Sequence, residues 1–470
     1  MKNAGRICFL IICFAMCLLP SAGMLVQPSD TSSENRTLAK MPDIKEDGKW
    51  NIDFLPQLGT YFQDHFAFRS ELVSADAQIQ SRIFRVSNVD TITVGTDGWL
   101  YYTATVDDYM GRSLLSERGI RNIVHNLSLV QDYVQHHGAK FLFTVPPNKN
   151  SLYGEHMPYY LQKKAGTVHN MDMLEKKIKK SGISYADLFQ LFETQKEQLY
   201  LKRDSHWNEK GAVLVYDMLL NELNIEHDRY ETVKAIRSKD AYGDLNRMLY
   251  PLTGEPEWDY DYKKDPVFLY RTDTESVEDA WIETENKSGS GTLLMFRDSF
   301  GNTLLPLMAD TFANGYFSRA VPQNISRYME QCKPDVVILE KVERNISELA
   351  KMPPIVEGAA VTLDQKPELI DSDTSNTSIE IKGEDALYWI ISGRLDNSLW
   401  SEDAKIYIRV SENETQTTYK TFWVTNEESD YGYQLSLPKE SITGLGVGLE
   451  VIVKSKGRCQ IVKTAYVDLD

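Results

Sequence analysis

The feature that most constrains the fold is a repeated alternation of amphipathic helices with short apolar strands through the middle of this 470-residue chain. Residues 118–136 place apolar side chains on one helical face, and Gly138 then ends the helix before the apolar run 140–145. The same order recurs with helices at 171–180 and 208–223 and strands at 183–186, 292–296 and 335–339. This alternation predicts an α/β domain with a mostly parallel sheet flanked by helices, whose chemistry lies where the carboxyl ends of strands meet loops.

The pattern of apolar and polar residues changes on either side of this region. We predict an N-terminal stalk and helix at 24–89, the α/β domain at 90–350, a linker at 351–376 and a β-sandwich at 377–470. Within the stalk, residues 50–84 have apolar side chains at helical spacing, and residues 91–102 read as a hairpin around the Asp97-Gly98 turn. The C-terminal region carries short alternating runs separated by turn residues and no helical period, which is typical of a sandwich.

The first residues, 1–23, have the pattern of a signal peptide or a signal anchor. A short positive end precedes the apolar core 7–19, and small residues follow it. The core is short for a spanning helix, which favours a cleaved signal peptide. We therefore expect an exported, extracytoplasmic protein that is secreted or tethered through this segment. The two cysteines outside it, Cys332 and Cys459, lie far apart in sequence and are expected to be free thiols.

The chain is acidic, with a formal net charge of −17. Such a surface repels nucleic acid and anionic lipid, so we expect neither as a partner. We also predict no cofactor and no metal ion in the chemistry of this protein.

The stretch 199–211 contains a candidate acid-base pair. An apolar run is expected to form a strand that stops at Arg203, and Asp204 and His206 follow directly. If the backbone stays extended, these two side chains face the same side, because consecutive residues of a strand point to opposite faces. The carboxylate of Asp204 would then orient the imidazole of His206, which leaves one ring nitrogen free to act as a base.

A candidate nucleophile lies in the stretch 291–302. An apolar strand runs into Arg297 and Asp298, and Ser299 then stands at the turn into an apolar helix. A serine at this place projects its hydroxyl at the sheet edge, where backbone N–H groups at the helix start can stabilise an oxyanion. Asp204, His206 and Ser299 together form a complete Asp-His-Ser set.

Each of these residues also has a structural explanation. Asp204, Ser205 and Asn208, like Asp298 and Ser299, are residue types that cap helices regardless of function. A lone His206 is more often structural, and Trp207 is more often a core residue than a sugar platform. Metal binding by Asp204, His206 and Asp298 is a further alternative, although no second histidine stands at ligand spacing.

These motifs resemble those of the DHHW family, relatives of alginate O-acetyltransferases that carry an SGNH-hydrolase-like domain. The resemblance rests on Asp-Ser-His-Trp-Asn at 204–208 and on a later strand that ends in Arg-Asp-Ser-Phe at 297–300. Supporting stretches between about residues 34 and 345 are 35–38, 62–69, 94–102, 146–149, 243–245 and 334–344. The resemblance implies an SGNH-hydrolase-like α/β domain at 90–350. The C-terminal sandwich matches the carbohydrate-binding module that is frequent in the family only in position and class.

The resemblance implies that Ser299 is the nucleophile, His206 the base and Asp204 its orienting carboxylate. The order is permuted relative to ordinary SGNH hydrolases, in which the serine comes first and the Asp-His pair last. Arg297 occupies a position where those enzymes usually have glycine. Because of this departure, the oxyanion geometry of those enzymes does not carry over. The backbone N–H of Ser299 is the expected oxyanion donor, Asn148 and Arg297 are candidate side-chain donors, and Trp207 is a candidate substrate contact.

The function that follows is an extracytoplasmic, serine-dependent O-acyltransferase, most consistent with an O-acetyltransferase that modifies hydroxyls of an exopolysaccharide or cell-wall glycan. The partners would be a glycan acceptor and, as the resemblance implies, a membrane-bound O-acyltransferase that relays acetyl groups from the cytoplasm.

Two other classes of function stay open. A carbohydrate esterase would use the same triad with water as the acceptor. A non-catalytic glycan-binding or assembly protein would instead rely on C-terminal aromatics, which otherwise belong to the sandwich core: Tyr388, Trp389, Trp400, Trp423, Tyr431 and Tyr433.

Overall fold

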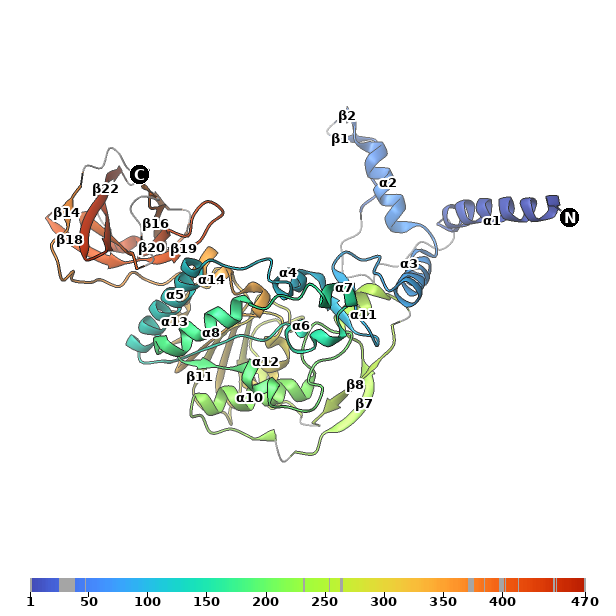
Figure 1. The fold of residues 1–470 in the computed structure, drawn as a ribbon, viewed down its shortest axis with the longest axis horizontal. Coiled ribbons are helices and arrows are strands. Elements are labelled where there is room, and N and C mark those ends of the chain that lie inside the picture. Colours follow the sequence, from blue (N-terminus) through green and yellow to red (C-terminus); the bar gives the residue numbers. More distant parts are fainter. Residues whose placement is uncertain are drawn as a thin grey trace.

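The computed structural model describes residues 2–24, 39–46, 48–230, 233–252, 254–262, 265–370, 376–383, 385–396, 401, 403–412, 414–442, 444 and 446–468. Helix α1 (Lys2–Gly23) extends away from an α/β body, and the C-terminal strands lie on the opposite side of that body (Figure 1). Of the described helices, none combines the length and the apolar character needed to cross a membrane.

The α/β body is built on a seven-stranded sheet of order β6-β5-β13-β11-β12-β10-β9. The first five strands in this order run parallel to one another, and β10 and β9 add an antiparallel edge. Their bounds are β5 (Lys140–Thr144), β6 (Tyr185–Ala186), β9 (Leu269–Tyr270), β10 (Trp281–Glu285), β11 (Thr292–Phe296), β12 (Asn314–Ser318) and β13 (Val336–Glu340). The predicted α/β class with a mostly parallel sheet is confirmed.

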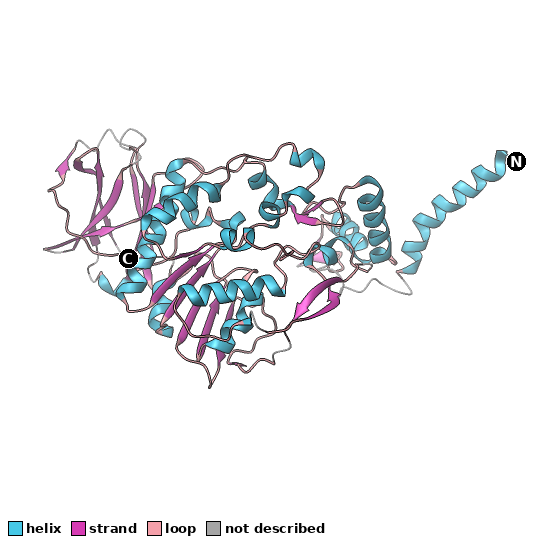
Figure 2. Cartoon of the chain, turned by 60° about the horizontal axis from the view of Figure 1, so that its bottom comes forward, coloured by secondary structure: helices cyan, strands magenta, loops and turns pink. Residues whose placement is uncertain are grey.

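Helices cover both faces of this sheet (Figure 2). Alternate residues of β11 serve the two faces: Leu293 and Met295 pack with α9 (Leu188–Glu193), α10 (Glu209–Glu222) and α12 (Gly301–Thr311). Leu294 and Phe296 pack on the other side with helices that include α5 (Glu117–His136), α8 (Asn170–Ser181) and α13 (Ile325–Cys332). Strands buried on both faces read as continuous apolar runs, which is why the sequence revealed β5, β11 and β13.

The N-terminal part is helical with one interruption. The segment predicted as one helix at 50–84 forms α2 (Phe54–His65), α3 (Arg69–Ile79) and a π-helical turn at Gln80–Phe84. The break falls at Phe68, which adopts a left-handed backbone conformation with φ of 60°. The predicted hairpin follows as β3 (Ile92–Val94) and β4 (Leu100–Tyr102), paired antiparallel.

Shorter elements complete this part of the chain. They are β1 (Lys45–Glu46), β2 (Lys49–Trp50), α4 (Val106–Tyr109), α6 (Lys149–Leu152), α7 (Tyr159–Gln162), β7 (Ile236–Ala241), α11 (Asp244–Leu249), β8 (Glu257–Asp261) and α14 (Glu348–Lys351).

The C-terminal region is a β-sandwich, as predicted. One sheet has the order β14-β22-β21-β17-β18 and the other β15-β16-β20-β19. The strands are β14 (Glu368–Leu369), β15 (Ser378–Lys382), β16 (Tyr388–Arg394), β17 (Lys405–Glu412), β18 (Thr415–Lys420), β19 (Phe422–Val424), β20 (Gly432–Pro438), β21 (Gly446–Ser455) and β22 (Arg458–Asp468). Apolar side chains from both sheets form one core between them.

The aromatic residues considered as a sugar-binding surface are mostly part of this sandwich. Tyr388, Trp423, Tyr431 and Tyr433 are buried, and Trp389 is half-buried. Trp400 lies outside the described residues. Alternation in a two-layer sandwich turns every second side chain inward, and these large rings supply core volume. The buried rings are therefore not available as stacking platforms for a glycan.

The cysteines behave as predicted. Cys332 is a half-buried free thiol and Cys459 a buried one.

Candidate active site

Ser299 lies between the end of β11 and the start of α12, at the carboxyl edge of the parallel strands. The side chain of Asp298 fixes this turn. Its Oδ1 accepts the N–H of Phe300 at 2.9 Å, and its Oδ2 accepts the N–H of Val342, which follows β13, at 2.7 Å. Ser299 itself is half-buried, so its hydroxyl is held at the surface of the sheet edge.

The segment before Asp204 differs from the prediction. Residues 199–203 do not form a strand of the sheet, and their ladder contact is a single bridge between Tyr200 and Trp207. The chain folds back on itself here, because Leu199 O accepts the N–H of Asn208 at 2.8 Å. Leu199, Tyr200 and Leu201 are buried, so an apolar run that resembled a strand is a buried loop.

Asn208 caps the helix that follows this loop. Its Oδ1 accepts the N–H of Gly211 at 2.9 Å at the start of α10. The capping explanation therefore holds for Asn208, and it leaves Asp204 and Ser205 to be explained in another way.

The loop brings Asp204, His206 and Ser299 into one hydrogen-bonded chain. Nε2 of His206 lies 2.8 Å from Oγ of Ser299, and Nδ1 lies 2.7 Å from Oδ1 of Asp204. The same Oδ1 accepts the backbone N–H of His206 at 2.9 Å, so Asp204 is hydrogen-bonded to the histidine at two points. The two residues meet through a tight turn rather than through an extended strand. With Asp204 ionised, Nδ1 carries the proton and Nε2 is the acceptor for the serine hydroxyl.

Electrostatics keep the carboxylate charged and the imidazole basic. Burial opposes ionisation of Asp204, but hydrogen bonding to His206, the charge of that ring and backbone N–H groups lower the pKa of Asp204 to about 2. Burial acts to lower the pKa of His206, and the hydrogen bond and charge of Asp204, with the charge of Asp244, outweigh it and hold the pKa above its ordinary value. This is the pattern of a base that an adjacent anion orients and strengthens.

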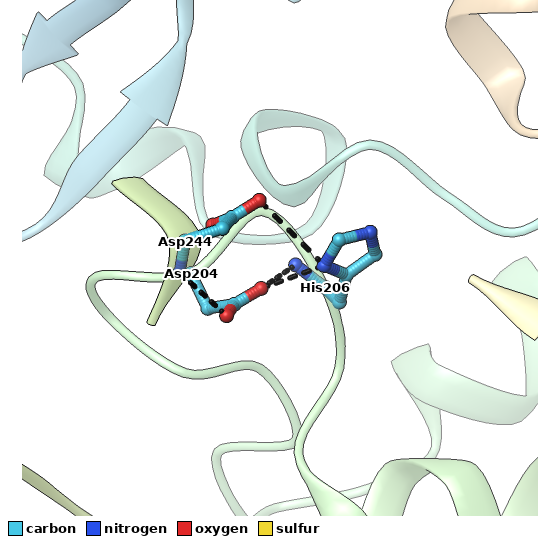
Figure 3. A group of neighbouring side chains, drawn as sticks. All are labelled: Asp204, His206 and Asp244. Carbon is cyan, nitrogen blue, oxygen red and sulfur yellow. Dashed lines mark hydrogen bonds and ion pairs between the residues drawn. The ribbon is translucent and has the colours of Figure 1, made fainter. Parts of the chain in front are cut away.

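Asp244 is a second carboxylate beside this pair (Figure 3). One of its oxygens, Oδ2, lies 3.8 Å from Nδ1 of His206 and accepts the hydroxyl of Ser205, while Oδ1 accepts the N–H of Ser205 at 2.7 Å. Its own N–H donates to Oδ2 of Asp204 at 2.9 Å. In the sequence, Asp244 stands out only as part of the stretch 243–245, which supports the family resemblance. Its position at the start of α11, far along the chain from Asp204, gave no local signal of this contact.

Lys149 holds the loop that carries Asp204. Its buried ammonium donates to the carbonyl oxygens of Leu201, Lys202 and Asp204 at 3.2, 2.8 and 2.5 Å. Burial lowers the pKa of Lys149 to about 8, against the nearby carboxylates, above all Asp204. The sequence does not predict this role either, because the stretch 146–149 supports only the family resemblance.

Two candidate substrate contacts have structural roles instead. Trp207 is 2% exposed; its Nε1 donates to Oγ1 of Thr303 at 2.6 Å and its ring packs edge-on to Phe300. Trp207 is thus a core residue and not a sugar platform, because its ring lies within the apolar layer under the site.

Arg297 is also held in the interior. Its guanidinium donates to Oδ1 of Asn302 at 2.5 Å and to Val277 O at 2.6 Å. The side chain is buried, and burial lowers its pKa to about 10 despite the neighbouring Glu340. These contacts fasten the turn after β11, so Arg297 is better explained as a structural residue than as an oxyanion donor.

Asn148 keeps the properties expected of a donor. Its backbone N–H donates to Oε2 of Glu343 at 2.7 Å, but neither polar atom of its buried side-chain amide has a partner among the described residues. It stands just after β5, whose carboxyl end lies at the same sheet edge as that of β11. A buried amide without a partner calls for an explanation.

The group of possible metal ligands in the structure differs from the one that the sequence suggested. Asp298 is engaged with two backbone N–H groups and does not join Asp204 and His206. Asp204, His206 and Asp244 do have ligand atoms within 4.8 Å of one another. Hydrogen bonds to His206, Ser205 and the Asp244 N–H already engage these carboxylates, which favours the orientation of an imidazole over the binding of an ion.

The α/β sheet with helices on both faces has the fold class of an SGNH-hydrolase-like domain, as predicted. Residues 92–289 match the family model described as the SGNH hydrolase-like domain of the acetyltransferase AlgX. That segment includes Asp204, His206 and Asp244 and ends before Ser299.

One relative agrees with this class. The chain is 25% identical over 263 residues to a Pseudomonas syringae pv. tomato protein named "Probable alginate O-acetylase AlgJ", and the match covers 53% of this chain and 61% of that protein. The predicted resemblance to the alginate O-acetyltransferase relatives is thereby confirmed.

Two solved structures are also similar. Bacillus cereus PatB1, solved with a sulfonyl adduct, has a TM-score of 0.44 at 17% identity over 55% of this chain and 96% of its own. A DHHW family protein from Eubacterium siraeum has a TM-score of 0.38 at 15% identity over 48% of this chain and 86% of its own.

Proposed function

We propose that this protein is an extracytoplasmic, serine-dependent O-acetyltransferase that modifies hydroxyls of an exopolysaccharide or cell-wall glycan. The observation that carries the proposal is the hydrogen-bonded chain from Asp204 through His206 to Ser299. Such a chain activates a serine hydroxyl as a nucleophile in acyl transfer. The match to an acetyltransferase family and to a protein named as an alginate O-acetylase supports the choice of acetyl group and glycan.

The first half-reaction forms an acetyl-enzyme. Oγ of Ser299 attacks the carbonyl carbon of the donor while Nε2 of His206 takes the hydroxyl proton. The N–H of Ser299 and the amide of Asn148 are the proposed donors to the oxyanion. When the intermediate collapses, the bond to the leaving group breaks and the leaving group takes the proton from His206. Asp204 stays ionised and stabilises the imidazolium.

The second half-reaction transfers the acetyl group. A sugar hydroxyl gives its proton to His206 and attacks the acetyl carbon, and Ser299 leaves as the hydroxyl with the proton that His206 returns. Water competes with the sugar, so transfer depends on orientation of the acceptor, for which effective molarities on the order of 10⁵ M or more are available. A membrane-bound O-acyltransferase as the source of acetyl groups, and export through residues 1–23, remain parts of this proposal.

The experiment that tests this function offers an activated acetyl ester and a panel of oligosaccharides to the full-length protein. We expect acetylated sugar, identified by mass spectrometry, and none with Ser299→Ala. Free acetate alone across neutral and acidic acceptors would replace the transferase by a carbohydrate esterase. The absence of any turnover of the ester would count against both enzymatic functions and favour a binding or assembly role.

A further inference from the structure

Arg344 lies beside the proposed nucleophile and has not been assigned a role. It belongs to the 3₁₀ turn Glu343–Asn345 that follows β13, at the same sheet edge as Ser299. Its guanidinium carbon stands 5.8 Å from the ring centre of Phe300, the residue after Ser299. The ring of His206 lies 4.8 Å from the same phenyl ring, so the arginine and the base share one aromatic neighbour.

The cationic group of Arg344 is held by aromatic rings rather than by an anion. A second ring, that of Tyr102 at the end of β4, lies 5.5 Å from the guanidinium carbon. No ion pair joins Arg344 to a carboxylate of the described residues, whereas Arg203 pairs with Glu255. The adjacent Glu343 turns its carboxylate to the N–H of Asn148 and the hydroxyl of Ser151.

The charge of Arg344 is therefore available in a half-buried position next to the base. The charge of Arg344 also acts on the base. Burial and Arg344 both lower the pKa of His206, whereas Asp204 raises it. In a chain with a formal net charge of −17, Arg344 is a cation beside the proposed nucleophile that has no counter-ion in the described part of the chain. A planar guanidinium fixed on aromatic faces presents its donors as a fork that fits a carboxylate or a phosphate.

Tyr102 supplies a second polar group to the same place. Its side chain is half-buried, and its hydroxyl makes no hydrogen bond with the described part of the chain. An arginine fork with a neighbouring phenol hydroxyl can hold an oxyanion and one further sugar oxygen.

We propose that Arg344, together with Tyr102, binds a carboxylate or phosphate group that the glycan acceptor carries next to the hydroxyl to be acetylated. This inference rests on the proposed transferase function and adds a substrate class to it. The acceptor is then an acidic glycan, and Arg344 aligns its hydroxyl with the acetyl group on Ser299. The overall negative charge of the protein disfavours non-specific binding of such a polymer, so recognition depends on a local cation such as Arg344.

The test separates the two half-reactions. Wild type, Arg344→Gln, Arg344→Lys and the control Arg271→Gln, at an exposed arginine near Glu285, receive the same acetyl ester. Hydrolysis of this neutral ester reports formation of the acetyl-enzyme. Transfer is measured to oligosaccharides of matched length that carry uronate, methyl-esterified uronate, phosphate or no charge.

We expect wild type to prefer an anionic acceptor over its neutral analogue. In Arg344→Gln, kcat/KM for the anionic acceptor falls about 10- to 100-fold relative to ester hydrolysis, as expected for loss of a charge-assisted hydrogen bond. Arg344→Lys keeps the charge without the fork and retains part of the preference. The uronate and phosphate arms identify which anion is recognised.

Two results overturn the inference. One is an equal loss of ester hydrolysis and transfer in Arg344→Gln, which would make the arginine a donor to the reaction's own oxyanion. The other is an unchanged preference between charged and neutral acceptors. If no acceptor is acetylated at all, calorimetric binding of the same oligosaccharides to the Ser299→Ala protein and to its Arg344→Gln derivative decides. Arg344-dependent binding of an anionic oligosaccharide would uphold the anion site although the transferase fails, and its absence would end the inference.

Discussion

At the scale of single residues, the two carboxylates near His206 make unequal contributions. Asp204 contacts Nδ1 at 2.7 Å and Asp244 at 3.8 Å, and both raise the pKa of the imidazole. A base must be neutral to accept the serine proton, so kcat/KM is lost as pH falls through this raised pKa. We expect the acid limb of the profile above the usual histidine value of about 6.5.

Two substitutions test which carboxylate contributes more to the pKa of His206. Asp204→Asn should lower the pH of the acid limb and reduce kcat by several orders of magnitude, up to about 10⁴, since an amide can hold the wrong tautomer. Asp244→Asn should shift the limb in the same direction by less and leave most of kcat. pH profiles of ester hydrolysis measure both. Equal shifts would contradict the unequal contributions of the two carboxylates, and a flat profile in wild type would contradict the assignment of His206 as the base.

Asn148 gives a second prediction at this scale. Because its buried amide bonds to no described group, Asn148→Ala should cost little stability. As an oxyanion donor it should nevertheless contribute about 10²- to 10³-fold to kcat. Thermal unfolding and ester hydrolysis, measured side by side, check this. An unchanged kcat would remove Asn148 from the site.

At the scale of elements, the loop at 199–208 is held from both sides. Lys149 bonds three of its carbonyl groups, and the carboxylate of Glu257 accepts the N–H groups of Lys202 and Arg203 at 2.8 and 2.7 Å. The loop has no strand ladder to fix it. These two side chains set the position of Asp204 together with the N–H groups of Leu100 and Asn246, which donate to Lys202 O and Arg203 O.

Removal of the buried ammonium should therefore damage both folding and rate. We expect Lys149→Met to destabilise the protein by about 1–3 kcal/mol, the cost of buried carbonyls without a partner. It should also lower kcat more than it raises KM, because Asp204 loses its position. Lys202→Met is the control, because this half-buried lysine belongs to the loop and its ammonium lies near the ring of Trp99 instead of bonding the loop's carbonyl groups. A full rate in Lys149→Met would show that the loop keeps its shape without the lysine.

The elements also show what sequence reasoning can and cannot reach. The strand at 292–296 and the helix at 118–136 agree closely with β11 and α5, because burial on both faces or on one helical face leaves a clear period in the sequence. The triad residues were selected through their motif and residue types. The prediction of a strand at 199–203 was wrong, because buried apolar loops and strands share one local pattern. The side chains that hold the loop, Lys149 and Glu257, come from distant parts of the chain.

Contacts between distant segments account for the remaining misses. Trp207 was a candidate sugar contact, and its burial beneath the site depends on Thr303 and Phe300 from α12 and the turn before it. Asp244 and Arg344 reach the site from other elements with no spacing rule that relates them to His206. Side chains of this kind become visible only when the sheet order brings their loops to one edge.

At the scale of the whole molecule, the C-terminal sandwich packs against helix α5. Asn126 of that helix donates to Leu349 O and Trp423 O, and its side-chain oxygen accepts the N–H of Trp423 at 2.8 Å. The guanidinium of Arg118 donates to Ala404 O and lies over the ring of Trp423. Such a buried contact holds the sandwich in a fixed orientation to the α/β body, whatever its role in binding glycan.

This contact gives a prediction that is separate from the chemistry. Asn126→Ala should lower stability by about 1–3 kcal/mol through the buried backbone groups left without a partner, while hydrolysis of a small acetyl ester stays unchanged at temperatures where the protein is folded. Asn88→Ala, at an exposed asparagine paired with Asp76, is the matched control. A fall in ester hydrolysis that exceeds the unfolded fraction would instead link the sandwich to the active site.

The central claim is that Ser299 is the nucleophile. Its most direct test treats the full-length protein with an aryl sulfonyl fluoride, digests it, and maps the modified residue by tandem mass spectrometry. We predict one adduct on the Oγ of Ser299, lost in Ser299→Ala and slowed in Asp204→Asn, with loss of ester hydrolysis in proportion to labelling. Labelling at another residue with activity abolished, or complete labelling of Ser299 with activity retained, would contradict the account.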